Sequence, residues 1–284
     1  MSVQSYEQNK NFIWRYTKNE ISHEAVNIMH YDSSMVVTCL IRGSGSVFVE
    51  NSRTELSDGD VIIISPNEFH RALFDDIPDH ERISVYVQPT LAESMGIDGD
   101  LLFGAFFERK QGRGNVIPSS VAKELGIHAL LSTMKAPENE DDADGDILLQ
   151  CKIVELLLLL KKALPMAEKN PIPSRESKTT TAVVEYINAH LTEELTTSGI
   201  ADALFLDKSY LCREFKKNTG ATISQYVTKK RICAAINLMS AGVSCTDACY
   251  RSGFGNYSSF YKYYRRYTDA IPAEAKIKKA EKRG

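Results

Sequence analysis

The sequence of 284 residues lacks long hydrophobic runs and closely paired cysteines. The five leucines Leu156–Leu160 lie between Lys152 and Lys161, and they fall far short of the roughly 20 apolar residues that a membrane span needs. The polar segment MSVQSYEQNK at the N-terminus lacks the apolar core of a secretory signal. The six cysteines are scattered without a C-x-x-C pair, which is typical of free thiols in a reducing compartment. These absences predict a cytoplasmic protein that makes no membrane contact.

Each half of the chain is poor in one sign of charge, although the net charge of the whole is only −3. Residues 1–177 hold 17 basic and 27 acidic side chains, whereas residues 178–284 hold 17 basic and 10 acidic ones. At roughly 150 residues per domain, the length predicts two domains. The charge of +7 on the second half makes polyanions its natural partners.

Residues 31–90 have the pattern of short β-strands. Turn signals such as Gly43-Ser-Gly45 and Asp58-Gly59-Asp60 separate segments that are rich in β-branched residues. These segments are Val36–Ile41, Ser46–Val49, Val61–Ser65 and Ile83–Val87. Their close spacing and tight turns predict an antiparallel sandwich or barrel.

Helical patterns follow from about residue 100. Ser119 or Ser120 caps a predicted helix over Val121–Met134, and a strongly apolar helix is predicted over Ile147–Leu164. The leucines of the second helix occupy more than one face, which indicates packing on the barrel, on a second subunit, or on both. We therefore expect this helix to form a homodimer.

Residues 165–178 contain three prolines and many polar side chains, and the sign of the charge changes across them. This composition predicts a linker. The expected organisation is an α+β chain with a first domain over residues 1–164, a linker over 165–178 and an all-helical domain over 179–284.

The basic half contains an internal repeat, because residues 207–216 and 256–265 match at a constant offset of 49. Asp207 aligns with Asn256, and both are good helix N-caps. An inward apolar pair aligns, Leu211 and Phe215 with Phe260 and Tyr264. An outward stripe of polar and basic residues also aligns: Ser209, Cys212, Arg213 and Lys216 with Ser258, Tyr261, Lys262 and Arg265. Each segment follows a short helix and a tight turn, so the sequence contains two copies of a helix-turn-helix pattern.

An ordinary helical bundle with a solvated charged face is the alternative for this half. Two basic stripes at the same register favour nucleic-acid binding over that alternative. A long helix over Ser224–Met239 connects the copies. In the aromatic cluster of the second copy, we expect three side chains in the core and two on the outer face: Phe260, Tyr264 and Tyr267 inside, and Tyr257 and Tyr261 outside.

From about Thr197 to Ala275 the sequence resembles the AraC/XylS family of bacterial transcription regulators. The matching positions are Ala201, Ser209–Lys216, Gly220, Gln225–Val227, Arg231, Ala235, Gly253-Phe254, Asn256, Ser258–Phe260, Tyr264–Arg266 and Pro272. Cys249 departs from the usual Ala, and Asp269 and Ile271 from the usual Gly and Thr, without touching the stripes. The resemblance implies a DNA-binding transcription regulator, with double-stranded DNA as partner and RNA polymerase as a further candidate partner. An activator is the expected type, and a repressor is the alternative that the sequence leaves open.

The first half resembles the cupin-like effector domain of this family in Ile41–Gly45, Asp58–Asp60 and Pro66–His70. Cupin enzymes hold a metal with a His-x-His pair, but His23 and His30 lie seven residues apart here. Cys245 and Cys249 share a helix face without a nearby His, which favours core packing over metal binding. We therefore expect no metal, no cofactor and no catalytic residue, and a cupin isomerase is the less favoured alternative.

The resemblance places the DNA contacts on the two stripes. We expect Arg213 and Lys262 to contact base edges, since Arg pairs bidentately with guanine and Lys donates as a point charge. We expect Lys208, Lys216 and Arg265 to contact phosphates. The expected weak polar or shape contacts come from Ser209, Cys212, Tyr257, Ser258 and Tyr261.

The barrel mouth is the expected site of a small effector. Arg42 and His70 are the leading candidates, with Arg82 and Tyr86 as weaker ones. The alternatives are a surface arginine at Arg42 and a structural histidine at His70. An inward arginine suits a sugar or a carboxylate. The function predicted from the sequence is transcription regulation in response to this effector, and the alternative is control of the first domain by a protein partner.

Overall fold

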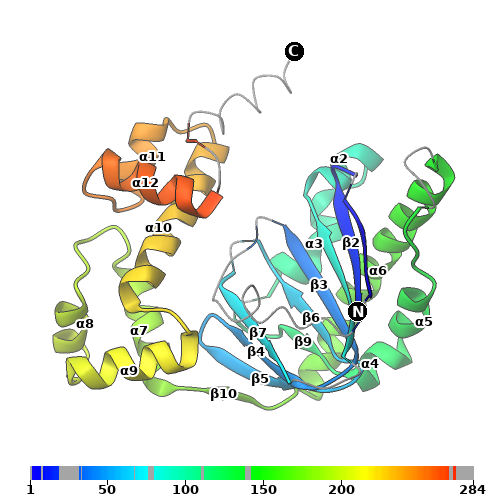
Figure 1. Cartoon of the computed structure of the whole chain (residues 1–284), viewed down its shortest axis with the longest axis horizontal. Helices are drawn as coiled ribbons and strands as arrows, with labels where there is room; N and C mark the ends of the chain where they lie inside the picture. The colour runs from blue at the N-terminus through cyan, green and yellow to red at the C-terminus, as the bar shows by residue number, and fades with distance from the viewer. Residues whose placement is uncertain are drawn as a thin grey trace. The chain divides into compact units, whose positions relative to one another are not determined.

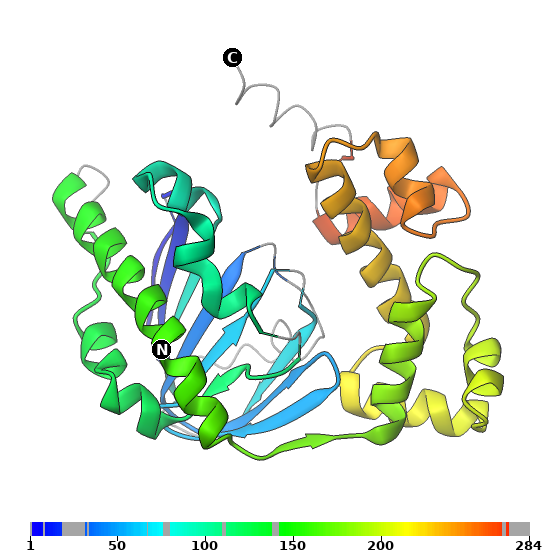
Figure 2. The same ribbon diagram turned by 180° about the vertical axis from the view of Figure 1, so that it is seen from behind.

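The computed structural model describes residues 2–7, 9–18, 32, 34–66, 68–75, 80–109, 112–137, 142–268 and 271–272. The chain divides into two compact units, Met1–Glu176 and Ser177–Gly284, which we call unit 1 and unit 2. Unit 1 combines sheets with helices, and the regular structure of unit 2 is helical throughout its described residues (Figures 1 and 2). The α+β fold class predicted from the sequence is confirmed.

The described strands of unit 1 form two antiparallel sheets. The six-stranded sheet has the order β1-β2-β8-β3-β6-β9, and the four-stranded sheet has the order β10-β5-β4-β7. The strands are β1 (Ser2–Tyr6), β2 (Phe12–Lys18), β3 (Met35–Arg42), β4 (Gly45–Val49), β5 (Ser52–Leu56), β6 (Val61–Ile64), β7 (His70–Phe74), β8 (Glu81–Val87), β9 (Val116–Ile117) and β10 (Ser174–Glu176).

The central strands β3 and β6 of the six-stranded sheet are buried on both faces because they are apolar at nearly every position. In β3, Val37 and Cys39 pack in a core shared with the helices, whereas Val36 and Leu40 pack in a second core shared with the four-stranded sheet. Successive side chains of a strand point to opposite faces, so both faces of this sheet need a cover. Helices cover one face and the four-stranded sheet covers the other (Figure 1). We call the space between the two sheets the inner face.

The four strand segments predicted from the sequence correspond to β3, β4, β6 and β8, with ends that differ by one or two residues. The prediction missed the remaining strands. β5 shows why, since its sequence Ser-Arg-Thr-Glu-Leu is largely polar and it is held by pairing with β4 and β10 on its two sides. Such a strand depends on its neighbours rather than on its own composition.

The helices of unit 1 are α2 (Thr90–Met95), α3 (Gly99–Phe107), α4 (Ser119–Glu124), α5 (Ile127–Ser132) and α6 (Ala143–Lys169). The single helix predicted over Val121–Met134 is wrong, because two short helices, α4 and α5, occupy this stretch. Gly126 separates them with a φ of 74°, a left-handed conformation that glycine adopts readily.

The linker predicted over residues 165–178 is largely part of unit 1. α6 continues to Lys169 with Ala163 and Ala167 buried, and this packing outweighs the helical hydrogen bond that Pro165 removes. Residues Ser174–Glu176 form β10, which pairs with β5. Only short stretches therefore remain outside regular structure between α6 and unit 2.

Unit 2 consists of α7 (Lys178–Ala189), α8 (Thr197–Ala203), α9 (Lys208–Thr219), α10 (Ile223–Ser240), α11 (Cys245–Arg251) and α12 (Tyr257–Thr268). The predicted repeat appears as two helix pairs, α8–α9 and α11–α12. Asp207 Oδ1 accepts the backbone N–H of Tyr210 at 2.8 Å, and Asn256 Oδ1 accepts that of Ser259 at 2.8 Å. The two N-caps thus keep the offset of 49, as predicted.

α10 supplies core residues to both helix pairs. Tyr226 near its start packs edge-on against Phe215 of α9, with ring centroids 5.4 Å apart. Ile232, near its middle, belongs to the core that includes Phe260 and Tyr264 of α12. Of the three predicted core positions of α12, Phe260 and Tyr264 are buried, whereas Tyr267 is only partly buried. None of the helices in the described part of the chain is long and apolar enough to cross a membrane.

Candidate nucleic-acid interface

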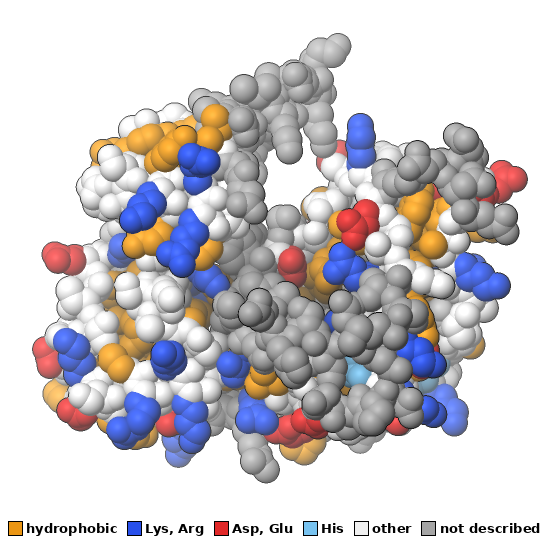
Figure 3. Space-filling model, in the orientation of Figure 1, with side chains coloured by type: hydrophobic (Ala, Val, Ile, Leu, Met, Phe, Trp, Pro, Cys, Tyr) orange, Lys and Arg blue, Asp and Glu red, His pale blue; other side chains and the backbone are white. Residues whose placement is uncertain are grey.

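The outward stripe of α9 lies on the surface of unit 2. Five side chains predicted to contact DNA are exposed: Lys208, Ser209, Cys212, Arg213 and Lys216. Leu211 and Phe215 on the opposite side of the helix are fully buried. The helical period therefore separates a packing face from a polar-basic face, and Lys and Arg side chains are visible over α9 in Figure 3.

The stripe of α12 is exposed at Ser258, Lys262 and Arg265. Tyr257 and Tyr261 are half-buried rather than fully outward. The Tyr257 ring lies 5.6 Å from that of Phe260 and 6.5 Å from that of Tyr261. Tyr257 packs partly against the core of α10–α12, so its contribution to the surface is smaller than the sequence predicts.

Arg213 is held in place by an aromatic neighbour that the sequence analysis did not select. Its guanidinium carbon lies 5.9 Å from the ring centroid of Tyr210, within the range of a cation–π contact. The hydroxyl of Tyr210 is 3.5 Å from Thr179 Oγ1 on α7. The i, i+3 spacing of Tyr210 and Arg213, which places neighbouring side chains on one helix face, is the sequence signal that could have revealed this contact. The equivalent position of the second copy is Ser259, so this support exists on α9 alone.

Phe205 is a second residue missed by the sequence analysis. It lies in the turn between α8 and α9, has a φ of 55°, and is 95% exposed. Gly253 holds the corresponding place before α12, with a φ of 93°. A left-handed conformation costs a bulky residue about 1 kcal/mol or more, so Phe205 is both strained and unpacked within unit 2.

Three of the four effector candidates lie on the inner face of unit 1. Tyr86 pairs with Val36 and Arg82 with Leu40, and His70 pairs with Val49. Directly paired residues point to the same side, and these three partners belong to the core between the sheets.

His70 is held from two sides. Its Nδ1 lies 2.9 Å from the backbone oxygen of Glu68, and its Nε2 lies 3.4 Å from Asp32. Arg42 differs, because it is exposed at the end of β3 after an irregularity in the strand. The structure thus brings together His70, Arg82 and Tyr86 on one face and leaves Arg42 at the surface.

His80 is an inner-face residue that the sequence analysis did not select. Arg82 Nη1 donates to His80 Nε2 at 2.9 Å, which leaves the proton of the neutral ring on Nδ1. The Phe74 ring lies 4.6 Å from the imidazole, and His80 is fully buried. Burial, together with the charge of Arg82, lowers the pKa of His80 to about 4. Its position two residues before Arg82 was the only sequence signal.

The described residues contain no group of three or more His, Cys, Asp or Glu side chains that could hold a metal ion. Cys249 is buried and Cys245 half-buried among apolar neighbours, and the Sγ of Cys245 donates to the backbone oxygen of Pro272 at 3.3 Å.

Residues 200–276 match a family model described as a helix-turn-helix domain. The HTH-type transcriptional activator RhaS of Citrobacter koseri is 28% identical over 149 residues, which cover 52% of each chain. An uncharacterised HTH-type transcriptional regulator of Staphylococcus aureus strain COL is 21% identical over 243 residues, which cover 85% of this chain and 31% of that one. The chain thus spans about half, or less, of the length of these relatives.

Solved structures also match. An apo ToxT variant from Vibrio cholerae is 16% identical with a TM-score of 0.39, and the match covers 96% of this chain and 99% of that one. A DNA-binding transcriptional dual regulator from Escherichia coli K-12 is 25% identical with a TM-score of 0.33, covering 36% of this chain and 99% of that one.

The capped, surface-facing helices of unit 2 and the match over residues 200–276 define this unit as a helix-turn-helix domain. The similarity of this unit to HTH-type transcription regulators supports the resemblance to the AraC/XylS family found in the sequence.

Proposed function

We propose that the protein is a sequence-specific DNA-binding transcription regulator whose two outward stripes, on α9 and α12, contact successive major-groove faces. The observation that carries this proposal is the repeat itself. Two helices with the same N-cap geometry expose polar-basic residues at the same register. A solvated face does not require such a duplication, whereas two successive major-groove faces, one DNA turn apart, match it.

The length of α10 supports simultaneous binding by both stripes. This helix has 18 residues and spans about 27 Å between the two helix pairs. One turn of DNA is about 34 Å, so two recognition helices at its ends come close to that spacing, and a modest bend of the DNA accommodates the difference.

The first test is the Arg213→Ala variant. Arg213 is exposed, oriented by Tyr210 and able to pair bidentately with guanine. We expect the variant to lose about 1–3 kcal/mol of discrimination at one base position and to keep its preferences elsewhere. The measurement is the dissociation constant for every single-base change of a site selected from random duplexes.

Lys216→Ala is the matched control on the same helix. It should weaken all duplexes to a similar extent and lower the slope of log affinity against log salt by about 1, because it removes one phosphate contact. Equal weakening of every sequence by Arg213→Ala would show that Arg213 does not contact a base edge.

Unit 1 is the sensor in this proposal, a cupin-like barrel that binds a small effector on the inner face near His70, Arg82 and Tyr86. Arg82 suits a sugar or a carboxylate, and its bond to His80 orients its guanidinium. This regulator acts in the cytoplasm without a catalytic step or a cofactor. RNA polymerase is the expected partner of its activator role.

The homodimer predicted from the sequence is also part of the proposal. The outer side of α6 leaves Leu148 61% and Leu158 39% exposed. A shallow groove beside them is lined by Met95, Cys151, Val154, Glu155, Leu158, Leu159 and Lys162. A second copy of α6 would cover this apolar strip, and two copies would place their DNA-binding units on adjacent half-sites.

We expect sedimentation equilibrium at micromolar concentration to give a dimer, and the double variant Leu148→Glu with Leu158→Glu to give a monomer that remains folded. Two carboxylates cannot be buried unpaired in an apolar interface. Leu101→Glu on α3 is the control, since Leu101 is 55% exposed but lies outside α6. A wild-type monomer, or a dimer insensitive to both α6 changes, contradicts this role of α6.

A further inference from the structure

The segment of residues 190–196, which joins α7 to α8, is bound to α10. Arg231 of α10 donates from Nε to the backbone oxygen of Leu191 at 2.9 Å and from Nη2 to that of Glu193 at 2.6 Å. α7 ends at Ala189, so these oxygens lie just beyond its C-terminal end, where an arginine side chain is a favourable donor. One side chain therefore holds the segment that precedes α8 against α10.

The same segment packs against the turn between α11 and α12. Gly253 in this turn has a φ of 93°. A Cβ atom at this position would lie 2.5 Å from the backbone oxygen of Leu191 and 2.9 Å from both Thr192 Cα and Arg231 Nε, which is too close for any side chain. The turn of the second helix pair thus meets the segment before the first pair at backbone contact. We call Leu191, Thr192, Arg231 and Gly253 the junction.

α7 connects this junction to α9. Near the start of α7, Thr180 is fully buried, and its Oγ1 accepts from Asn218 Nδ2 of α9 at 3.0 Å. α7 has 12 residues and is about 18 Å long, so it spans from α9 to the junction. α10 makes a separate connection through its core contacts with both helix pairs. Two connections along different paths resist the rotation of α12 about the axis of α10 that a single helix would permit.

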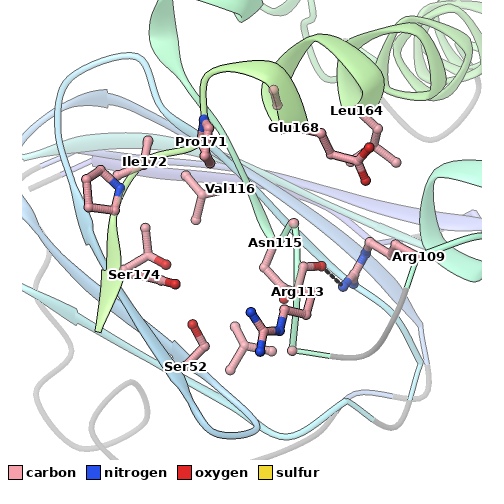
Figure 4. Close-up of a pocket in the computed structure, with 16 residues that line it drawn as sticks. Ser52, Arg109, Arg113, Asn115, Val116, Leu164, Glu168, Pro171, Ile172 and Ser174 are labelled. Atoms are coloured by element: carbon pink, nitrogen blue, oxygen red, sulfur yellow. Dashed lines mark hydrogen bonds between the residues drawn. The ribbon is translucent and has the colours of Figure 1, made fainter. Parts of the chain in front are cut away.

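α7 also follows the effector site in the chain. Unit 1 contains a cavity of about 470 Å³, and Val49, Val116 and Ile172, which line it in part, also contact the core between the two sheets (Figure 4). The cavity belongs to the inner face, where the effector is proposed to bind. Its last lining residue along the chain is Ser174, and α7 begins at Lys178. The first helix of unit 2 after the effector site is therefore the one that ends at the junction.

From this geometry we infer that Arg231 is a positioning residue for DNA recognition. It holds the junction closed, which fixes the distance and the rotation between α9 and α12 and thereby selects the number of base pairs between the two parts of the DNA site. This inference rests on the DNA-binding function proposed above. A rigid connection gives the second helix a high effective concentration at one spacing and a low one at all others. One base pair changes the rotation between two groove faces by about 35° and their separation by about 3.4 Å, so a rigid pair distinguishes single base pairs.

The test is a spacing series. It measures the affinity of the full chain for the selected site and for duplexes in which one or two base pairs are inserted or deleted between its two parts. We expect the wild type to lose about tenfold or more in affinity at the first change. Arg231→Met removes both donors and should bind the original site about tenfold more weakly, with less than about threefold variation across the series. Arg231→Lys keeps one donor and should restore part of the spacing preference.

Lys230→Met is the matched control, because it removes the same charge from the neighbouring position of α10. It should keep the spacing preference of the wild type even where it weakens binding. Gly253→Ala tests the junction from its other side and should flatten the spacing series as Arg231→Met does. Gly255→Ala adds the same methyl group in the same turn, but into open space, and should leave the series unchanged.

A second measurement needs no DNA. Pulsed electron spin resonance gives the distance between nitroxide labels on exposed Cys212 of α9 and on a cysteine introduced into α12 by Lys262→Cys. The background carries Cys151→Ser and Cys245→Ser, and the labelled chain is diluted with unlabelled chain so that only distances within one copy contribute. We expect a narrow distance distribution when Arg231 is present and a broader one in Arg231→Met.

A spacing series that Arg231→Met leaves as steep as in the wild type overturns the inference, and so does an unchanged distance distribution. A series flattened equally by Lys230→Met also overturns it, since charge alone would then explain the effect. If Arg231→Met does not fold, Arg231→Lys and Gly253→Ala decide in the same way. A wild-type chain that binds no duplex specifically contradicts the proposed function instead, and the label distances still test the junction.

Discussion

Replacement of Glu68 by Gln should lower the free energy of unfolding of unit 1 by about 3–5 kcal/mol, because it leaves the buried guanidinium of Arg109 without its countercharge. Glu68 is fully buried, and its oxygens accept from Arg109, from the backbone N–H of Gly112 at 2.6 Å and from that of Ser65 at 2.9 Å. Burial alone would raise the pKa of Glu68, but the hydrogen bonds and charge of Arg109, with the backbone donors, lower it. The carboxylate is therefore charged at neutral pH.

The measurement is urea unfolding followed by tryptophan fluorescence. The sequence contains one tryptophan, Trp14, which lies in the core of unit 1, so its signal reports on this unit. Glu55→Gln is the control, because Glu55 pairs with Arg53 at 3.2 Å on the surface and should change stability by less than about 1 kcal/mol. Equal stabilities of the two variants would show that the Glu68–Arg109 pair adds nothing to the fold.

The second large effect is a loss of unit 1 stability on acidification from pH 6.5 to pH 4. A histidine in the unfolded chain is half protonated near pH 6.5, whereas buried His80 is half protonated only near pH 4. Between these values the unfolded state binds more protons, so stability is complete above pH 6.5 and decreases as the pH falls. A shift of this size corresponds to about 3 kcal/mol.

His80→Gln isolates this contribution, since glutamine does not titrate and can still accept from Arg82. The difference in stability between pH 6.5 and pH 4, followed by Trp14 fluorescence, should be about 3 kcal/mol smaller in the variant than in the wild type. Carboxyl groups such as Asp60, whose pKa is raised by burial, contribute equally to both proteins and cancel. His190→Gln in unit 2 is the control and should leave the pH dependence unchanged. An unchanged pH dependence in His80→Gln would mean that His80 is protonated in the folded state at its ordinary pKa.

The helical unit was predictable to the level of single hydrogen bonds. The caps of Asp207 and Asn256 and the burial of Leu211, Phe215 and Phe260 follow from helical spacing and N-cap chemistry, which are local properties. Three tyrosines were exceptions: Tyr257 and Tyr261, predicted on the outer face, and Tyr267, predicted in the core, are all partly buried. For Tyr257, the helical wheel did not include the contact with Phe260.

The sheet unit was less predictable because its elements depend on distant partners. β3 and β6 are apolar on both faces and were identified. The polar strand β5 depends on pairing with β4 and β10, and the short strand β10 pairs with β5 across about 120 residues of sequence. Pro165 indicated a linker, but burial of Ala163 and Ala167 keeps the helix intact around it.

The sequence by itself determined the division of charge, the α+β class, the repeat at an offset of 49 and the side chains of the two stripes, because each follows from composition or from periodicities of a few residues. Only the tertiary structure decided that Arg82 meets His80, that Glu68 meets Arg109, and that Arg231 meets the segment before α8. Burial sets the strength of these polar contacts, and burial arises when segments far apart in the chain exclude water together.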